Sequence, residues 1–457
     1  MNNLYAGFCK LDVTPMRDIP ISGYYIRRTN QKVLDPLEVV ALALKSGDKT
    51  ALLMAIDMCV MPTAIIVDFV KYVSEITKVP TDSIYLHCTH THTSPVADKR
   101  SMHWDESCER DEALIGEYRT FLRRKVADAA VWAIEDLKPA KMGYAIGKAE
   151  NVAFVRRFRM KDGSVKTNPG VNNPDIVAPI GDVDERVSVV RFDRDGANNI
   201  VLVNFANHPD VIGGNNISAD WPGLMRRTVE KAIDGVNCIF FNGAQGDVNH
   251  VNVHPTPGYL NDTFNDFDDV SRGYGHAIWM GRVVAGAVMQ VYDKAVYLDV
   301  DSIRCVRKAV EIPLNVPTKE EAVNAHRIND LHNAGRDSEL PYQGMMLTTI
   351  VAEAARMVRL ENSPATCPME FTAFAVGNIA FFGIPGEPFT GIGRAIKEAE
   401  GYDLVLPSCI VNGCEGYFPM MDSYDEGGYE ARSSNYKRGA AELMIEKGLE
   451  ILADLRK

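Results

Sequence analysis

The chain has 457 residues, of which 46% are hydrophobic and 24% charged, and its formal net charge is -12. These proportions are ordinary for a globular protein, and the length allows two or three average domains or one large one. The acidic balance argues against nucleic acid as a partner and offers no basic face to anionic lipid.

The sequence shows no targeting or membrane-spanning segment. The first residues, from Met1 to Ala6, contain no basic stretch followed by an apolar one, so no signal peptide is expected. The best apolar run, residues 51–61, contains Asp57 and is too short to span a bilayer. The nine cysteines are scattered without any Cys-x-x-Cys pair, which favours free thiols in a reducing compartment. We therefore expect a cytoplasmic protein without a transmembrane segment, whose oligomeric state the sequence does not indicate.

The first quarter of the chain predicts a strand–helix–strand unit. Residues 1–48 have the pattern of irregular strands and loops, including a glycine-bearing turn with aromatic and cationic side chains at 22–28. An apolar strand is expected at 50–58, a helix with apolar residues at helical spacing at 63–77, and a short strand at 83–88. Such a unit implies that its two strands are parallel.

The remaining elements alternate between helices and strands. Further helices are expected at about 106–137, 221–233, 273–292, 318–334 and 343–360, and further strands at 151–159, 186–192, 199–206, 236–241, 296–314, 368–376, 378–384 and 404–411. Residues 161–183 and 243–268 are expected to be long loops. The pattern predicts an α/β fold in which mixed β-sheets are flanked by helices.

No repeat, low-complexity tract or linker divides the chain. We therefore expect residues 1–457 to form a single domain. The texture of the sequence changes near residue 294, so that domain could consist of two interleaved lobes, 1–293 and 294–457.

Two histidines follow the predicted strand at 83–88. His90 and His92 are two residues apart, so in an extended chain both imidazoles point the same way. Open α/β sheets bind ligands outside the carboxyl ends of their strands. Imidazole binds zinc and also shuttles protons near neutral pH. Alone, the pair fits either a metal or catalytic site or two ordinary loop histidines.

Polar residues follow four other predicted strands in the same way. His208 follows one strand, the polar run 242–249 a second, Glu387 a third and Tyr417 a fourth. Strand-end histidines and a carboxylate are the ligands of zinc sites that keep an open position for water. Each residue also has a structural interpretation: Glu387 could cap the helix that follows it, and Tyr417 could be a half-buried aromatic.

Seven short segments, taken in chain order, resemble the catalytic domain of the neutral/alkaline (non-lysosomal) ceramidase family. The similar segments are Asp12-Val13-Thr14-Pro15, Asp35-Pro36-Leu37, His90-Thr91-His92, Asn207-His208-Pro209, Gly246-Asp247-Val248, Pro385-Gly386-Glu387, and Tyr417 with Tyr429-Glu430. The resemblance implies one ceramidase-like catalytic domain with a metal site at strand carboxyl ends. It further implies zinc-dependent hydrolysis of an N-acyl (amide) bond in a small-molecule substrate such as a sphingolipid.

The resemblance also implies a set of ligands. His90, His208, Glu387 and Tyr417 fall where the family's zinc ligands lie. His92 falls where the family keeps a histidine that handles the proton of the zinc-bound water, as general base and then as general acid.

Three further residues fall at family site positions. Tyr429 matches a tyrosine that contacts the substrate amide, where its hydroxyl would stabilise the oxyanion. Arg156 matches an active-site arginine, with Arg157 as the alternative in the register. Asn249 stands where the family has a serine, which excludes a serine nucleophile there, although an amide side chain can still hydrogen-bond.

The sequence also departs from the family at its ends. Family members usually carry a secretion signal and an additional C-terminal β-sandwich domain, and neither is visible between Met1 and Lys457. Both differences count against long-chain ceramide at a membrane surface as the substrate. The acyl chain, the amine and the choice between amide and ester stay open.

Two other functions compete with this interpretation. A His-x-His after an early strand also opens the metal-dependent amidohydrolase barrels, but such a barrel needs eight regular βα units, which the helix-poor stretch 140–210 fits poorly. The second is a metal-holding scaffold that has lost catalysis, with Asn249 as the mark of that loss.

The other histidines are given structural interpretations, except for two that flank the 246–249 loop. His250 and His254 could line the site. Asp247 is expected to shape its loop by bonding nearby backbone. The histidines expected to be structural or solvated are His87, His103, His276, His326 and His332.

Overall fold

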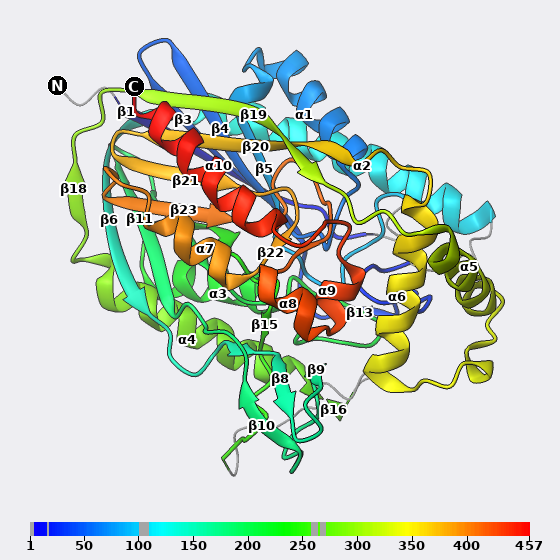
Figure 1. The fold of residues 1–457 in the computed structure, drawn as a ribbon. Helices are drawn as coiled ribbons and strands as arrows, with labels where there is room; N and C mark the ends of the chain where they lie inside the picture. Colours follow the sequence, from blue (N-terminus) through cyan, green and yellow to red (C-terminus); the bar gives the residue numbers. More distant parts are fainter. Residues whose placement is uncertain (1–3, 16–17, 100–108, 257–263, 266–270) are drawn as a thin grey trace.

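A computed structural model describes residues 4–15, 18–99, 109–256, 264–265 and 271–457 (Figure 1). The largest sheet has nine strands in the order β14-β12-β11-β6-β1-β3-β4-β5, with β18 beside β6. These strands are β1 (Leu4–Asp12), β3 (Glu38–Ser46), β4 (Lys49–Ile56), β5 (Ile84–Cys88), β6 (Lys138–Lys148), β11 (Arg186–Arg194), β12 (Asn199–Phe205), β14 (Val236–Asn242) and β18 (Val296–Leu298).

A second sheet has four strands in the order β19-β20-β21-β23. They are β19 (Ile303–Pro313), β20 (Thr366–Val376), β21 (Ile379–Gly383) and β23 (Leu404–Ser408). The smaller strands are β2 (Lys32–Val33), β7 (Phe154–Val155), β8 (Arg157–Met160), β9 (Val165–Thr167), β10 (Ile176–Pro179), β13 (Asn216–Ile217), β15 (Val248–Asn249), β16 (Phe264–Asn265), β17 (Ser271–Arg272), β22 (Glu387–Pro388) and β24 (Tyr417–Phe418).

The described part of the chain has ten helices, not all of which pack on the two sheets. They are α1 (Thr63–Thr77), α2 (Glu109–Glu135), α3 (Asp220–Ala232), α4 (Tyr274–Tyr292), α5 (Lys319–Asn333), α6 (Gly344–Leu360), α7 (Thr390–Lys397), α8 (Met421–Glu426), α9 (Tyr429–Ser433) and α10 (Ala440–Leu455). Helices α1 and α2 pack on the β3–β5 end of the large sheet, and α3 and α4 on its β11–β14 end. Helices α7 and α10 pack on the outer face of the small sheet (Figure 1).

The two sheets therefore pack face to face between layers of helices. Strand β3 shows the reason, because its side chains alternate between two hydrophobic cores. Val39 and Ala41 pack toward α1 and α2, whereas Val40 and Leu42 pack into the core between the sheets. Residues from both sides of position 294 contribute to that core. The ring centroid of Tyr85 lies 5.3 Å from that of Phe241 and 5.6 Å from that of Phe374.

The chain after β23 joins the sheets at their carboxyl ends. The backbone N–H of Cys88 donates to Ile410 O at 3.1 Å, and that of Cys409 donates to Asn242 O at 3.0 Å. His87 lies between these strands, with Nδ1 2.7 Å from Cys409 O and Nε2 accepting from the Asn242 N–H at 3.0 Å. Burial lowers the pKa of His87 to about 3, so the ring is neutral and bridges the backbone of the two sheets.

The predicted α/β class with mixed, helix-flanked sheets is confirmed, and the helix expected at 63–77 has those bounds. Strands β4 and β5 pair in parallel, as the strand–helix–strand unit requires. The strands and loops expected over 1–48 are present, but the strands are regular and not irregular, because β1 and β3 pair along nine residues each. The loop expected at 161–183 contains β9 and β10, which pair with β8. The predicted helix start at 106 and His103 lie outside the described residues.

Strand β6 was missed because glycines interrupt its pattern. A Cβ at Gly147 would lie 2.5 Å from Ala287 O on α4, and one at Gly143 would lie 3.2 Å from Val296 O on β18. These glycines thus mark close approaches of backbone, which a search for alternating side chains reads as a loop. Within the described residues, no helix has the length and apolar character needed to cross a bilayer.

The packing of the two sheets predicts the effect of core truncation. Phe374 is 0% exposed between the sheets, so Phe374→Ala should lower the free energy of unfolding by about 3–5 kcal/mol. Phe121 on α2 is 37% exposed, and Phe121→Ala should change it by less than about 0.5 kcal/mol. Chemical denaturation compares the two variants, and equal shifts would contradict the core assigned here.

Candidate metal centre

The centre lies where the chain leaves β4, β5, β12, β14 and β21. His90 follows β5 and is fixed by its backbone N–H, which donates to Met58 O at 2.9 Å. Its φ of 77° is in the left-handed region, which is uncommon for a residue other than glycine. Such backbone strain is found at functional sites, where surrounding contacts hold it in place.

Two histidines face each other across the centre. His90 Nδ1 lies 2.9 Å from Cys59 O, and His208 Nδ1 lies 3.1 Å from Gln245 O. Each Nδ1–H donates to its carbonyl, which fixes the ring and directs Nε2 inward. The two Nε2 atoms are 3.2 Å apart.

Glu387 completes a group of three. Its Oε2 lies 3.2 Å from His90 Nε2 and 3.5 Å from His208 Nε2, and it accepts from Gln245 Nε2 at 3.3 Å. The ligand atoms of His90, His208 and Glu387 all lie within 4.8 Å of one another, and all three residues are buried.

Tyr417 and Arg156 lie beside the carboxylate. Strands β22 and β24 pair in parallel, with Glu387 opposite Tyr417. The phenol of Tyr417 hydrogen-bonds to Glu387 and to Arg156, and the Arg156 guanidinium carbon lies 5.4 Å from the Tyr417 ring centroid. Arg156 is anchored by Glu430 Oε1 at 2.7 Å and Gly246 O at 2.7 Å.

The charges of the group are strongly coupled. Burial by itself would raise the pKa of Glu387, but His90, Arg156 and Tyr417 outweigh it and the pKa falls to about 2. Burial opposes the charge on His90, yet Glu387 raises the pKa of His90 well above its usual value. Burial, followed by Arg156 and the other histidines, lowers the pKa of His208 well below its usual value. These shifts leave His90 as a cation protonated on both ring nitrogens, Glu387 as an anion and His208 neutral.

This donor set fits a divalent cation. In a tetrahedral zinc site with bonds of about 2.0–2.1 Å, neighbouring ligand atoms lie about 3.3–3.4 Å apart. The separations here are 3.2 Å, 3.2 Å and 3.5 Å. Two imidazoles and a carboxylate, with a phenol alongside, are ligand types that suit zinc. A cation held by His90 Nε2 would displace the proton from that nitrogen.

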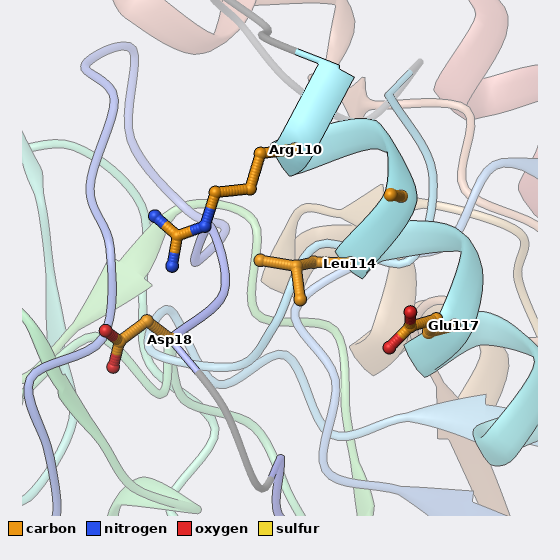
Figure 2. Close-up of a pocket in the computed structure, with 5 residues that line it drawn as sticks. Asp18, Arg110, Leu114 and Glu117 are labelled. Atoms are coloured by element: carbon orange, nitrogen blue, oxygen red, sulfur yellow. The ribbon is translucent and has the colours of Figure 1, made fainter.

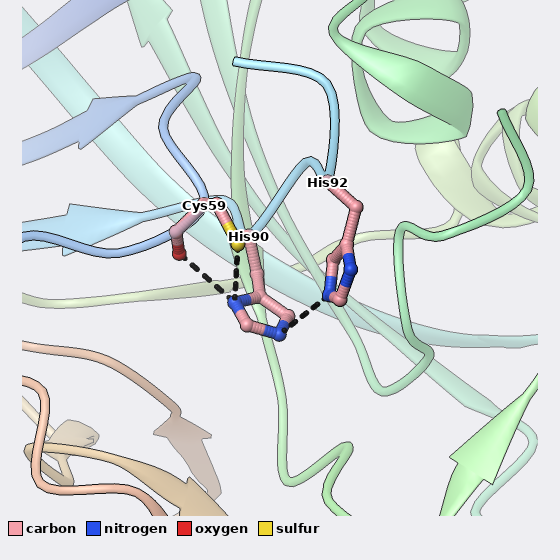
Figure 3. A group of neighbouring side chains, drawn as sticks. All are labelled: Cys59, His90 and His92. Carbon is pink, nitrogen blue, oxygen red and sulfur yellow. Dashed lines mark hydrogen bonds between the residues drawn. The ribbon is translucent and has the colours of Figure 1, made fainter. Parts of the chain in front are cut away.

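His92 lies next to His90, on the side of the ring away from Cys59 (Figure 3). Its Nε2 is 3.2 Å from His90 Nε2. Cys59 approaches the other side of the His90 ring, with Sγ 3.9 Å from Nδ1. The ligand atoms of Cys59, His90 and His92 also lie within 4.8 Å of one another, close enough to hold a metal ion. Cys59 and His92 contact opposite nitrogens of the His90 ring, so one ion cannot bind both at the same His90 nitrogen. His90, His208 and Glu387 direct their ligand atoms to a common point and form the better candidate site.

The structure brings most of the predicted site residues together. The Tyr429 ring lies 5.6 Å from that of Tyr417, and its hydroxyl is 3.4 Å from that of Tyr25. Arg156 is the arginine at the centre, whereas Arg157 donates to Ser423 and Glu426.

The side chain of Asn249 hydrogen-bonds to residues outside the centre. Its Nδ2 donates to Asn168 Oδ1 at 2.8 Å, and its Oδ1 accepts from the Val251 N–H at 3.0 Å. Asp247, in the same loop, accepts from the Thr390 N–H at 2.7 Å and hydroxyl at 3.0 Å, at the start of α7. Burial raises the pKa of Asp247 to about 6. The loop is thus tied to the segment that carries Glu387.

The remaining histidines lie in other surroundings. His326 pairs with Glu361 at 2.9 Å, and His332 pairs with Asp337 at 2.9 Å. The buried rings of His250 and His276 contact each other, with centroids 5.2 Å apart. His254 lies beside a surface cavity next to β8 and β10.

A separate hollow of about 490 Å³ lies on the surface at the start of α2 (Figure 2). Its lining residues are Asp18, Arg110, Ala113, Leu114 and Glu117. They carry charges of both signs and include neither histidine nor cysteine, so this hollow does not compete as a metal centre.

Sequence reasoning gave no site role to Gln245, although it lies in the polar run 242–249, and it missed Asp210, Tyr24 and Tyr25. Gln245 contacts both Glu387 and His208. Asp210 follows His208 by two residues, just as His92 follows His90, and that spacing was a usable signal. The two tyrosines belong to the turn at 22–28, which lies far from the other site residues in sequence.

The arrangement of sheets and helices has counterparts among solved structures. The neutral ceramidase from Pseudomonas aeruginosa superposes with a TM-score of 0.72 at 15% identity, covering 100% of this chain and 75% of that one. The chain has a neutral ceramidase-like fold. A structure described as a ceramidase complexed with C2 gives a TM-score of 0.70 at 14% identity, covering 100% and 76%. No protein-family model matches this chain, and no curated protein matches it by sequence.

The predicted resemblance to the ceramidases is therefore confirmed for the fold. The two packed sheets of this ceramidase-like fold are not the closed barrel that the amidohydrolase interpretation requires.

The coupling of His90 to Glu387 predicts how metal affinity depends on pH. Below its raised pKa, His90 holds a proton that an incoming ion must displace. The dissociation constant for Zn²⁺ should therefore fall about tenfold per pH unit as pH rises, and level off once His90 is neutral.

Competition with a chromophoric chelator at several pH values measures this slope. His326→Ala removes a partly exposed histidine of α5 and should leave the slope unchanged, whereas His208→Ala should abolish tight binding. An affinity that does not vary with pH would contradict the proton assignment.

Proposed function

We propose that this protein is a zinc-dependent hydrolase of an N-acyl amide bond that acts on a small-molecule substrate. The observation that carries the proposal is the convergence of His90, His208 and Glu387 on one point, with the Nε2 of His92 3.2 Å from that of His90. The ceramidase-like fold supports the same class of reaction, and the name of one such structure points to an N-acyl lipid as the model for the substrate.

We further propose a cytoplasmic location. The described cysteines are all free, and most are buried. Free thiols are typical of a reducing compartment.

His90, His208 and Glu387 would hold the ion, with Tyr417 as a further ligand. Bound zinc lowers the pKa of water to about 7 and polarises a carbonyl oxygen. Arg156 offsets the negative charge of Glu387, and its anchors at Glu430 and Gly246 keep it beside Glu387 and Tyr417.

His92 is the proposed proton carrier. Its Nε2 takes a proton from the attacking water as the new C–O bond forms at the amide carbon. The same nitrogen then donates that proton to the leaving nitrogen as the C–N bond breaks, which releases a carboxylic acid and an amine. Asn249 supplies no nucleophile, because an amide side chain cannot form the covalent acyl intermediate that a serine would.

Tyr429 is the proposed donor to the carbonyl oxygen. Burial, together with the neighbouring Tyr25 and Tyr417, raises the pKa of Tyr429 well above its usual value, so the phenol keeps its proton. Its O–H can donate to the oxygen as negative charge develops there. Loss of one such donor typically costs about 3 kcal/mol of barrier.

The division of roles predicts the outcome of replacing His92. His92→Ala should keep the bound zinc but lower kcat/KM by about 10²–10⁴-fold, because the general base and acid are lost. Elemental analysis gives the metal content, and turnover is measured on a panel of N-acyl compounds. His326→Ala, on the surface of α5, is the control and should change neither.

Loss of zinc from His92→Ala would instead make His92 a ligand. Zinc bound to the wild-type chain with no hydrolysis of any N-acyl compound would favour the metal-holding scaffold.

A further inference from the structure

The ring of His92 has a carboxylate behind it. Asp210 Oδ1 lies 3.5 Å from His92 Nδ1, the nitrogen opposite the one that faces the centre. The same oxygen accepts a hydrogen bond from the Tyr24 hydroxyl at 2.6 Å. The side chains of both His92 and Asp210 are largely buried, with 11% and 15% of their surface exposed.

The turn at 22–28 holds His92 from a second side. Gly23 has a φ of 113°, and a Cβ there would lie 2.8 Å from both the Cβ and the carbonyl oxygen of His92. Arg28 donates from Nη2 to His92 O at 2.7 Å. Its guanidinium carbon also lies 3.8 Å from the Tyr24 ring centroid. The Tyr24 ring in turn lies 5.7 Å from the His92 ring. Main chain and side chain of His92 are therefore both held in position.

We propose that Asp210, oriented by Tyr24, is a positioning residue that keeps the neutral His92 in the Nδ1–H form. A neutral imidazole carries one proton, and the partner of one nitrogen decides which nitrogen has it. A carboxylate accepts but does not donate, so it favours the proton on Nδ1. Nε2 is then left unprotonated toward the centre, as a base must be.

The inference deepens the proposed function and rests on it for its catalytic consequence. Once Nε2 has taken a proton, the charge of the same carboxylate would stabilise the imidazolium, and the two groups could close to a charge-assisted hydrogen bond. A separation of 3.5 Å suits this role before substrate binds, because catalytic hydrogen bonds are often long in free enzymes and shorten in the complex.

The test uses the zinc-loaded protein and two substitutions at one position. Asp210→Ala removes the acceptor, and His92 should shift toward the Nε2–H form. Asp210→Asn keeps an oxygen that can accept from both Tyr24 and His92, so the Nδ1–H form should be retained. Nitrogen-15 NMR of labelled histidine rings distinguishes the forms, and the His92 signals are assigned by their loss in His92→Gln.

The kinetic expectation separates positioning from a structural role. Asp210→Ala should lower kcat about 10–100-fold, with KM and zinc content nearly unchanged, and Asp210→Asn should recover part of that loss. Asp195→Ala, at an exposed aspartate in the β11–β12 turn, is the control and should change neither kcat nor the ring signals.

Tyr24→Phe tests the same contact if Asp210→Ala fails to fold. It should lower kcat several-fold, and combined with Asp210→Ala it should add nothing further, because both changes act through one contact.

Three results would overturn the inference: an Nε2–H form of His92 in the wild type, no change of form in Asp210→Ala, or loss of zinc from Asp210→Ala. The NMR readout needs no turnover. A wild-type chain that hydrolyses no N-acyl compound would therefore defeat the proposed function and still leave the assignment of Asp210 tested.

Discussion

The buried carboxylate of Glu387 is the constraint on which the centre depends. It is only 6% exposed, and burial of an unpaired charge would cost several kcal/mol. Its partners come from separate parts of the fold: His90 after β5, His208 after β12, Arg156 between β7 and β8, and Tyr417 on β24. The charge is compensated only when both sheets meet at their carboxyl ends, so the centre and the join between the sheets depend on each other.

Backbone geometry at the join makes this possible. Gly246 allows the loop after β14 to approach the carbonyl oxygen of Glu387, which a Cβ there would meet at 2.6 Å. His90 at φ 77° and Ile410 at φ 45° are both in the left-handed region, and Ile410 is β-branched. Each such residue stores about 1–3 kcal/mol of strain. Backbone hydrogen bonds to Gly386 and Cys88 hold Ile410 there, so the ligands are carried by a rigid frame.

The sequence was informative where the signal is local. Helical spacing predicted α1, and polar residues directly after apolar strands pointed to His90, His208 and Glu387. It was less informative where the determining contact is distant. The glycines of β6 are explained only by α4 and β18 on either side. Periodicity shows that a strand has two apolar faces, but not that the second face of β3 meets another sheet. Asn249 was assigned to the site by its position in a motif, and its contacts to Asn168 and Val251 became visible only in three dimensions.

Three histidines meet at this centre, and they differ in the group that lies at Nδ1 of each ring. His90 and His208 have a backbone carbonyl at Nδ1, a neutral acceptor that fixes the tautomer while adding no charge behind a proposed ligand. His92 has the carboxylate of Asp210 there instead, at 3.5 Å, which would stabilise the ring if it gains a proton as proposed. A ligand must present the same lone pair throughout turnover, whereas a base must accept a positive charge and lose it again. The Nε2 atoms of His208 and His92 both lie 3.2 Å from that of His90, so the proposed roles of the three rings differ by the group at Nδ1 and not by distance from the centre.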